Sequence, residues 1–312
     1  MNRYVSVTAD EPLKNDLQAL MRLARDEDLR DAGDWTSRLT IAESLRGSAD
    51  IVSRVSGVAA GIELIPWVVE IFDGDVEVEP HVGDGDRFER RANLATLRGR
   101  VRDVLTVERT VLNLVNRLCG IATQTAACVK QLDGTQAELY DTRKTTPGWR
   151  LIEKYAVRCG GGTNHRRGLY DGVLIKDNHV AFAAAASKNP VDLATLVSQA
   201  VAARGTVVDG HRVPDIVEVE VDGLEQFDRV LPLGADIILL DNFSIDDLRA
   251  AVTRRDAATS PVQLEASGNV RIDTIAMIAA TGVDRISSGA LTHQARSIDL
   301  GLDWTSGKID DR

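Results

Sequence analysis

The chain has 312 residues, of which 44% are hydrophobic and 4% aromatic, and its formal net charge is −10. This length is enough for two domains or for one barrel with an added module, and the composition is typical of a globular α/β enzyme. Nucleic acids and anionic membrane surfaces are bound by broad basic faces, so the acidic total argues against both kinds of partner and favours small-molecule chemistry.

The three cysteines, Cys119, Cys128 and Cys159, are odd in number, and their spacing fits neither a zinc site nor a disulfide framework. We interpret them as reduced thiols that serve mostly in packing. The N-terminal residues lack the apolar core of a signal peptide, and glutamates interrupt the apolar stretch at 57–72. We therefore expect a cytoplasmic protein.

The N-terminal part of the chain is predicted to form a sheet-rich domain. Apolar residues recur at helical spacing over 15–29, and turns rich in Gly and Asp then separate short strand-like runs between 49 and 101. Helical periodicity returns over 104–132, where we expect a break between two helices at Cys119 and Gly120. We place the domain boundary there, so that the N-terminal domain spans 1–120.

Beyond this boundary, short apolar runs that end in polar residues alternate with helical patterns such as 191–203 and 245–254. Alternating strands and helices predict a parallel sheet with right-handed crossovers, either wound open or closed into a barrel. We favour a barrel over 121–293, because its polar strand ends would then converge on one ligand. The predicted strands are 138–140, 173–175, 216–221, 237–240, 262–266 and 285–287.

The last segment differs from the units before it. Residues 298–304 alternate apolar and polar side chains with a period of two, which predicts a half-buried strand and not another helix. A single strand needs a partner, so we expect the C-terminal segment 294–312 to join the sheet of the N-terminal domain.

Cations concentrate between Asp141 and His179, where the chain has eight Lys or Arg but only four Asp or Glu. This local charge of +4 in an acidic protein predicts a site for an anionic ligand. Arg143 and Lys144 follow a predicted strand directly and would be held at its end. An Arg binds carboxylate or phosphate through two hydrogen bonds and a Lys adds a point charge, although a basic surface pair is the alternative.

Two further cationic positions belong to the same segment. His165 and Arg166 form a pair after a flexible triple glycine, and Lys176 ends another predicted strand. Three roles stay open for Lys176. It can form an imine with a carbonyl substrate, as the Schiff-base lysines of barrel aldolases do, it can bind an anionic substrate, or it can pair with Asp177.

Carboxylates and small residues follow the remaining strands. Glu218 and Glu220 point to one face of their strand, and Asp241 ends the next strand. These groups can bind ribose hydroxyls, Mg²⁺ or a developing positive charge, or they can be solvated surface carboxylates. The runs 267–269 and 288–290 offer hydroxyl and backbone N–H donors to a phosphate, or form plain turns.

A set of motifs, in one order along nearly the whole chain, resembles the quinolinate phosphoribosyltransferase family. A molybdenum-associated paralogue shares part of the pattern, but the run at 174–179 favours the quinolinate enzymes. The motifs are 108–113 (ERTVLN), 141–148 (DTRKTTPG), 153–162 (EKYAVRCGGG), 164–166 (NHR), 174–179 (LIKDNH), 217–220 (VEVE), 240–242 (LDN), 264–268 (LEASG) and 288–293 (SGALTH).

The resemblance implies an α/β protein in which an N-terminal α+β sandwich-like domain precedes an incomplete α/β barrel of fewer than eight strands. It implies transfer of the phosphoribosyl group of phosphoribosyl pyrophosphate (PRPP) to quinolinate with Mg²⁺. The products would be nicotinate mononucleotide, pyrophosphate and CO₂, in NAD biosynthesis. Both substrates are polyanions, which would explain a basic site in an acidic protein. The family also implies a homodimer, with an active site shared between subunits.

The resemblance further implies roles for single residues. Arg109 would come from the neighbouring subunit, and Lys144 and Lys176 would face the pyrophosphate. The implied catalytic residues are Lys144, Lys176, Glu220 and Asp241, and the last two would also meet the ribose hydroxyls and the metal. The cradle for the quinolinate carboxylates would comprise Arg109, Arg143, His165, Arg166 and Lys176. The 5′-phosphate would be bound by Ser267, Gly268 and Gly289, and the substrate-binding set also includes Thr142, Asn269, Ser288 and His293.

One residue departs from the family pattern, because Asn269 stands where a second glycine is common. We expect the phosphate loop to tolerate it, since Asn adopts left-handed conformations more readily than most residues. A Schiff-base aldolase or lyase that uses Lys176 is an alternative function, and a catalytically silent ligand-binding member is another. The cations outside the motif-based assignment, expected to be structural or peripheral, are Arg150, Lys154, Arg158 and Arg167.

Overall fold

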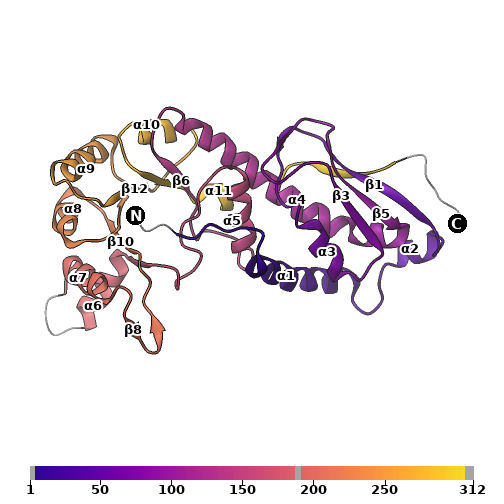
Figure 1. Ribbon diagram of the computed structural model, residues 1–312, viewed down its shortest axis with the longest axis horizontal. Helices are drawn as coiled ribbons and strands as arrows, with labels where there is room; N and C mark the ends of the chain where they lie inside the picture. Colours follow the sequence, from indigo (N-terminus) through magenta and orange to yellow (C-terminus); the bar gives the residue numbers. More distant parts are fainter. Residues whose placement is uncertain (1–3, 187–190, 306–312) are drawn as a thin grey trace. The chain divides into compact units, whose positions relative to one another are not determined.

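The computed structural model describes residues 4–186 and 191–305, and its contacts divide the chain into two compact units (Figure 1). We call them the antiparallel unit and the parallel unit after their main sheets. The linear domain boundaries 1–120 and 121–293 stay a prediction, since the two units interleave segments of the chain. Within the described residues, the antiparallel unit comprises 7–126, 145–161 and 291–305, and the parallel unit comprises 4–6, 127–144, 162–186 and 191–290.

The antiparallel unit is built on a four-stranded sheet with the order β14-β1-β5-β3. β1 (Arg46–Ser53) pairs with β5 (Asn93–Arg100) on one side and with β14 (Leu300–Trp304) on the other. β3 (Val76–Pro80) pairs with the free side of β5. The alternating segment near the C-terminus therefore forms an edge strand of this sheet, although it follows the parallel unit in the chain.

The helices of this unit bury apolar faces that are visible in the sequence. α1 (Glu11–Leu29) begins at Asp10, whose side chain accepts the N–H of Leu13, and it buries Leu13 and Leu17 completely. This confirms the helix predicted over 15–29. The other elements are α2 (Trp35–Thr40), β2 (Gly57–Val58), α3 (Ile65–Ile71), β4 (Arg87–Phe88) and α5 (Arg150–Cys159).

α4 (Val101–Val129) is one continuous helix of 29 residues, so the predicted break at Cys119 and Gly120 is wrong. Glycine at position 120 serves packing, because a Cβ there would lie 2.0 Å from the carbonyl oxygen of Arg296. A glycine inside a helix costs about 1 kcal/mol relative to alanine. Here it lets the chain that leads to β14 lie directly against the helix.

The parallel unit contains a six-stranded sheet with the order β6-β13-β12-β11-β10-β7. Every pairing in it is parallel, and all six strands coincide with predicted runs. Among the described residues the sheet keeps two edge strands, β6 and β7, so the predicted incomplete barrel of fewer than eight strands is confirmed. The bounds are β6 (Glu138–Tyr140), β7 (Val173–Ile175), β10 (Val217–Val221), β11 (Ile237–Asp241), β12 (Gln263–Ser267) and β13 (Arg285–Ser287).

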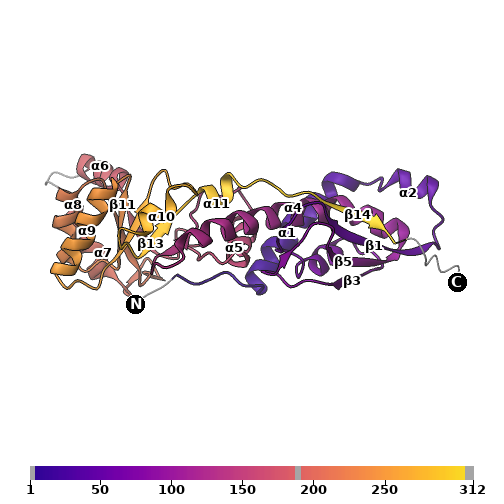
Figure 2. The ribbon, with the colours of Figure 1, turned by 90° about the horizontal axis from the view of Figure 1, so that it is seen from above.

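Helices cover this sheet, and Figure 2 shows α7, α8 and α9 side by side next to β11. α7 (Leu193–Ala203) and α9 (Ile245–Ala257) confirm the two predicted helices, and the Ser244 hydroxyl caps α9 by accepting the N–H of Asp247. A hairpin of β8 and β9 was not predicted. The remaining elements are η1 (Lys130–Leu132), α6 (Asp177–Ala186), β8 (Val207–Val208), β9 (His211–Arg212), α8 (Leu224–Val230), η2 (Leu231–Leu233), α10 (Ile275–Ala279) and α11 (Ala290–His293).

In the described part of the chain, none of the helices combines the length and the apolar character that crossing a bilayer requires.

Candidate functional site

The carboxyl ends of the parallel strands bring together most of the residues that the sequence singled out. Because the strands all point the same way, their carboxyl ends share one edge of the sheet. Asp241 and Ser267 are paired residues of adjacent strands. Arg143 and Lys144 follow β6, Lys176 follows β7, Glu220 lies near the end of β10, Asp241 ends β11, Ser267 ends β12, and Ser288 and Gly289 follow β13.

Lys176 and Glu220 form an ion pair at this edge. Glu220 is thus the partner that the structure gives to Lys176, in place of the Asp177 considered from the sequence. Burial raises the pKa of Glu220, Lys176 lowers it, and the negative charges of Asp241 and Asp177 raise it again, with a net increase. An ammonium held by a carboxylate is poorly suited to imine formation, which needs the neutral amine.

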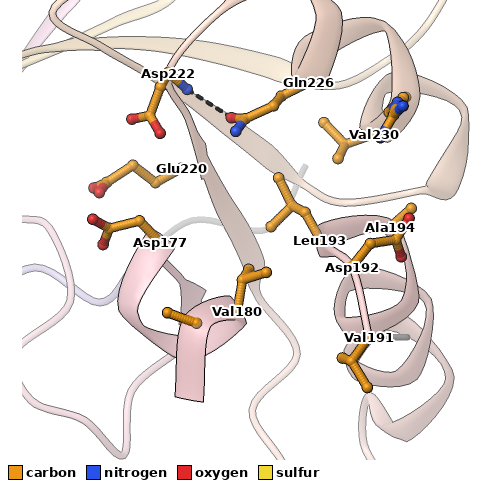
Figure 3. Close-up of a pocket in the computed structure, with 12 residues that line it drawn as sticks. Asp177, Val180, Val191, Asp192, Leu193, Ala194, Glu220, Asp222, Gln226 and Val230 are labelled. Atoms are coloured by element: carbon orange, nitrogen blue, oxygen red, sulfur yellow. Dashed lines mark hydrogen bonds between the residues drawn. The ribbon is translucent and has the colours of Figure 1, made fainter. Parts of the chain in front are cut away.

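Carboxylates also line a cavity of about 420 Å³ beside the Lys176–Glu220 pair. Figure 3 shows Asp177, Glu220 and Asp222 one after another along one wall, with apolar side chains such as Leu193 opposite them. The backbone N–H of Asp222 donates to Gln226 at 2.8 Å. The sequence reasoning had given no role to Asp222. Its position two residues after Glu220, directly after the end of β10, is the signal that could have identified it.

The predicted phosphate loop has a left-handed backbone at two positions, and the neighbouring Asn242 after β11 has one as well. Gly268 has φ 89°, Asn269 has φ 51° and Asn242 has φ 55°. The expectation that Asn269 adopts a left-handed conformation is therefore confirmed. A Cβ at Gly268 would lie 2.2 Å from Oδ1 of Asn242, so glycine is needed there for space as well as for conformation.

Asn242 links this loop to Asp241. Its amide nitrogen donates to Asp241 Oδ2 at 2.8 Å, and its amide oxygen accepts from Asn269 Nδ2 at 3.1 Å. The sequence analysis included Asn242 in a motif but gave it no role. An Asn directly after a strand-end carboxylate was the available signal, because Asn both adopts left-handed backbone and offers a donor and an acceptor.

Two predicted residues direct their side chains to the protein. The Thr142 hydroxyl accepts the backbone N–H of Lys144 at 3.0 Å. The Ser288 hydroxyl donates to the carbonyl of Val270 at 3.1 Å and is buried. In this arrangement both hydroxyls shape the turns after β6 and β13, and their contacts with substrate stay a prediction.

His165 and Arg166 are buried behind the strand end of β6. Asp141 accepts the backbone N–H of His165 at 2.8 Å and the side-chain amide of Asn164 at 2.7 Å. The Arg166 guanidinium donates to the carbonyl of Gly172 at 3.0 Å. These contacts join the loop 164–166 to the ends of two strands, and the quinolinate contacts of both residues stay a prediction.

Both ring nitrogens of His165 have protein partners. Nδ1 accepts the backbone N–H of Arg166 at 2.8 Å, and Nε2 lies 3.1 Å from Glu218 and 3.5 Å from Glu265. Burial lowers the pKa of His165, but the two carboxylates outweigh it and raise the pKa to about 9. The backbone N–H of Arg166 points at Nδ1, so Nδ1 accepts a hydrogen bond there and protonation of Nδ1 is opposed. Nε2 carries a proton in either form, so its donation to Glu218 does not depend on that balance.

Two sets of carboxylates could hold a divalent cation. His165, Glu218 and Glu265 place ligand atoms within 4.8 Å of one another, but Arg285 already donates to Glu265 at 2.6 Å. Glu220 and Asp241, on adjacent strands at the carboxyl edge, offer the hard oxygen ligands that Mg²⁺ prefers. The second set fits Mg²⁺ better, because this ion is usually bound by one or two carboxylates together with substrate phosphates.

Arg109 and His293 belong to the antiparallel unit. Arg109 lies on α4 with 65% of its side chain exposed and is 3.9 Å from Glu108. His293 ends α11 and is exposed. An exposed guanidinium on a helix can reach a ligand or a second molecule, so the predicted role of Arg109 is compatible with its surroundings in this unit.

The peripheral cations have structural partners nearby. Arg167 forms two hydrogen bonds with Asp171, and Arg150 donates to the hydroxyl of Thr145 at 3.2 Å. Lys154 is fully buried on α5. These contacts agree with the expectation that these three cations support the fold around the site.

Comparison with known proteins finds matches over most of the chain. Sequence models of the N-terminal and C-terminal domains of quinolinate phosphoribosyl transferase match residues 34–119 and 121–303. The nicotinate-nucleotide pyrophosphorylase (carboxylating) of Mycobacterium leprae is 43% identical and aligns over 91% of this chain and 95% of its own length. The probable enzyme of the same name from Bacillus subtilis is 40% identical, with 88% of each chain covered.

Solved structures show the same likeness in three dimensions. The nicotinate-nucleotide pyrophosphorylase of Francisella tularensis superposes with a TM-score of 0.84 at 36% identity, covering 97% of this chain and 100% of that one. The corresponding protein of Ehrlichia chaffeensis gives a TM-score of 0.80 at 33% identity, covering 92% and 98%.

Proposed function

The chain belongs to the quinolinate phosphoribosyltransferase family, and from this premise we propose that it transfers the phosphoribosyl group of PRPP to quinolinate with release of CO₂. The products are nicotinate mononucleotide, pyrophosphate and CO₂, in the de novo synthesis of NAD. The observation that carries the proposal is the strand-end edge of the parallel unit, where cations, two carboxylates and a phosphate-type loop lie together.

The cations of this edge, together with Arg166 of the loop 164–166, bind the two polyanionic substrates. Arg143 and Arg166 take the quinolinate carboxylates, Lys144 lies toward the pyrophosphate, and Lys176 lies between the two substrates. A hydrogen bond to a charged group contributes roughly 1.5–3 kcal/mol, so three or four such contacts are enough for useful affinity. The loop at Ser267, Gly268 and Gly289 binds the 5′-phosphate through hydroxyl and backbone donors.

The carboxylates of Glu220 and Asp241 act on the ribose. Departure of pyrophosphate breaks the bond at C1′ and leaves oxocarbenium-like charge on the sugar, which these carboxylates stabilise electrostatically. The ring nitrogen of quinolinate then bonds to C1′. Its positive charge stabilises the electron pair left at C2 when CO₂ departs, and a proton from solvent completes nicotinate mononucleotide. No nucleophile from the protein is required.

We further propose that Mg²⁺ accompanies PRPP and that Glu220 and Asp241 hold it. When bound, Mg²⁺ would neutralise charge on the pyrophosphate. The pairing of Lys176 with Glu220 supports this use of Lys176 as a cation and disfavours the Schiff-base alternative. We place the reaction in the cytoplasm of the cell.

The test is a direct assay of the purified chain. With quinolinate labelled at its 2-carboxylate, PRPP and Mg²⁺, we expect CO₂, pyrophosphate and nicotinate mononucleotide in equal amounts. Chelation with EDTA should stop the reaction and added Mg²⁺ should restore it. A folded chain that releases no CO₂ would contradict the proposal and favour a silent ligand-binding member.

The active site is proposed to be shared between the subunits of a homodimer, with Arg109 contributed by the neighbour. Arg109→Ala and Lys144→Ala should each abolish activity while the fold is retained. Mixing the two variants under conditions of subunit exchange should restore about a quarter of the activity, because half the dimers are mixed and each has one intact site. Absence of recovery, with exchange confirmed, would show that Arg109 serves its own subunit.

A further inference from the structure

Tyr4 lies outside both matched ranges, which begin at residue 34, so family membership assigns it no role. The contacts nevertheless group residues 4–6 with the parallel unit, although the chain continues from residue 7 into the antiparallel unit. Tyr4 is 6% exposed.

Four different contacts hold Tyr4. Its ring stacks on the imidazole of His165, with centroids 4.7 Å apart and planes at 29°. Its hydroxyl donates to Glu218 Oε2 at 2.8 Å. The guanidinium of Arg285 lies 5.5 Å from the ring centroid, and Gly172 packs so closely that a Cβ there would lie 2.7 Å from the Tyr4 ring.

These contacts place Tyr4 at the amino ends of the parallel strands, opposite the carboxyl edge that carries the proposed site. Gly172 precedes β7, Arg285 begins β13, and Tyr4 forms a small apolar cluster with Ile216 and Ile237, which lie at the starts of β10 and β11. The side chain of Tyr4, which is not part of the sheet, therefore fills part of the interior of the incomplete barrel at the amino ends of its strands.

The contacts lead from Tyr4 to the anion-binding loop in two steps. Tyr4 fixes the imidazole of His165 by stacking on one side of it, while Glu218 binds both the Tyr4 hydroxyl and His165 Nε2. His165 Nδ1 then accepts the backbone N–H of Arg166. Arg166 is one of the proposed quinolinate contacts, so its backbone is tied to the orientation of the imidazole.

We propose that Tyr4 is a positioning residue for quinolinate binding, which acts by holding His165 and Glu218 so that the loop 164–166 keeps its two proposed quinolinate contacts, His165 and Arg166, in place. The inference rests on the proposed function and assigns to the extreme N-terminus a part in substrate selectivity. Tyr4 touches no substrate itself. Its effect should therefore concern quinolinate and not PRPP, whose phosphate loop lies at β12 and β13.

Two substitutions separate the contributions of the hydroxyl and the ring. Tyr4→Phe keeps the ring and removes the donor to Glu218, and we expect the KM for quinolinate to rise about 3- to 10-fold, as for the loss of one buried hydrogen bond. Tyr4→Leu also removes the stack and should raise this KM further. The KM for PRPP should change less than twofold in both. Val5→Ala is the matched control, because Val5 is on the same segment but 56% exposed.

The measurements are KM for each substrate, kcat, quinolinate binding by calorimetry, and the unfolding midpoint. A purely structural role would lower the unfolding midpoint and leave the quinolinate KM of the folded protein unchanged, which would overturn the inference. Equal rises of both KM values would overturn it as well. If the unmodified chain neither binds quinolinate nor turns it over, both the proposed function and the inference about Tyr4 are wrong. If the unmodified chain is active and Tyr4→Leu leaves its kinetics unchanged, only the inference about Tyr4 is wrong.

Discussion

Both units have ion pairs at the surface, but they differ in how far their most buried described pair is withdrawn from water. In the antiparallel unit, Arg98 and Glu79 are 51% and 54% exposed, and the most buried pair keeps one partly exposed partner, since Arg117 is 21% exposed beside a fully buried Glu153. In the parallel unit, Arg285 and Glu265 are both 0% exposed and joined by a hydrogen bond of 2.6 Å. Exposed pairs are screened by water and contribute little, whereas buried ions lose hydration and must be satisfied by their partners.

The difference matters for function because the ion pair with both partners fully buried lies within the unit that carries the proposed site. Arg285 also lies 3.7 Å from the ring centroid of Tyr140 and borders Tyr4. A network of this kind is costly to bury, so its benefit should be the fixed orientation of groups such as His165. In the antiparallel unit, the backbone of the chain before β14 packs closely against α4 at Gly120.

The largest effect is expected from breaking the buried network. Arg285→Met leaves the buried carboxylate of Glu265 without its guanidinium partner, with His165 3.5 Å away, and should lower the free energy of unfolding by about 3–5 kcal/mol. Urea unfolding followed by circular dichroism measures it. The double variant Arg285→Met, Glu265→Met removes both charges and should recover part of the loss. A single variant as stable as the unmodified chain would mean that the pair does not bear on stability.

Close packing in the antiparallel unit should produce the next effect. Gly120→Ala places a methyl group 2.0 Å from the Arg296 carbonyl oxygen. Overpacking of this kind lowers the free energy of unfolding by about 1–3 kcal/mol. The higher helix propensity of alanine offsets part of this loss. Gly223→Ala is the control, since no atom lies within 4 Å of its added Cβ. Stabilisation by Gly120→Ala would show that the chain before β14 can move away from α4.

A change in the phosphate loop should act on binding more than on stability. Gly268→Ala introduces a Cβ 2.2 Å from Asn242 Oδ1 at φ +89°, and the loop must shift. We expect the KM for PRPP to rise about 10- to 100-fold, with a smaller change for quinolinate, as one charge-assisted hydrogen bond is lost. Gly134→Ala, at φ +83° in open space, controls for backbone strain. Equal kinetic effects of both variants would exclude a specific role of the loop.

The smallest effect is expected at the surface. Arg98→Ala removes a pair with Glu79 that is about half exposed and should change the free energy of unfolding by about 0–1 kcal/mol. The same urea titration at low and high salt checks this value. A loss as large as that of Arg285→Met would remove the contrast between the two units.

Local patterns in the sequence predicted most of the fold. The six parallel strands and helices α7 and α9 were found from apolar runs and capping residues, because both signals are short-range. The hairpin of β8 and β9 was missed, since two-residue strands carry almost no periodicity. The break predicted at Gly120 was wrong because a glycine can either interrupt a helix or allow close packing against it. Only the neighbouring Arg296 backbone shows that packing is the reason here.

The site was predicted in outline for a topological reason. Parallel strands send their carboxyl ends to one edge, so Lys176, Glu220 and Asp241 had to lie on the same edge once the alternation was recognised. Their individual partners could not be inferred in this way. Lys176 pairs with Glu220 and not with the adjacent Asp177, because the side chain follows the direction set by the sheet.

The order of elements, the polar strand ends and the family motifs were therefore determined by the sequence alone, since each depends on residues close together in the chain. Only the tertiary structure decided which distant groups meet. Tyr4 and His165 are separated by just over half of the chain, and yet their rings stack at 4.7 Å. No local pattern encodes such a contact, because it exists only when the strands have assembled and left an interior that Tyr4 can fill.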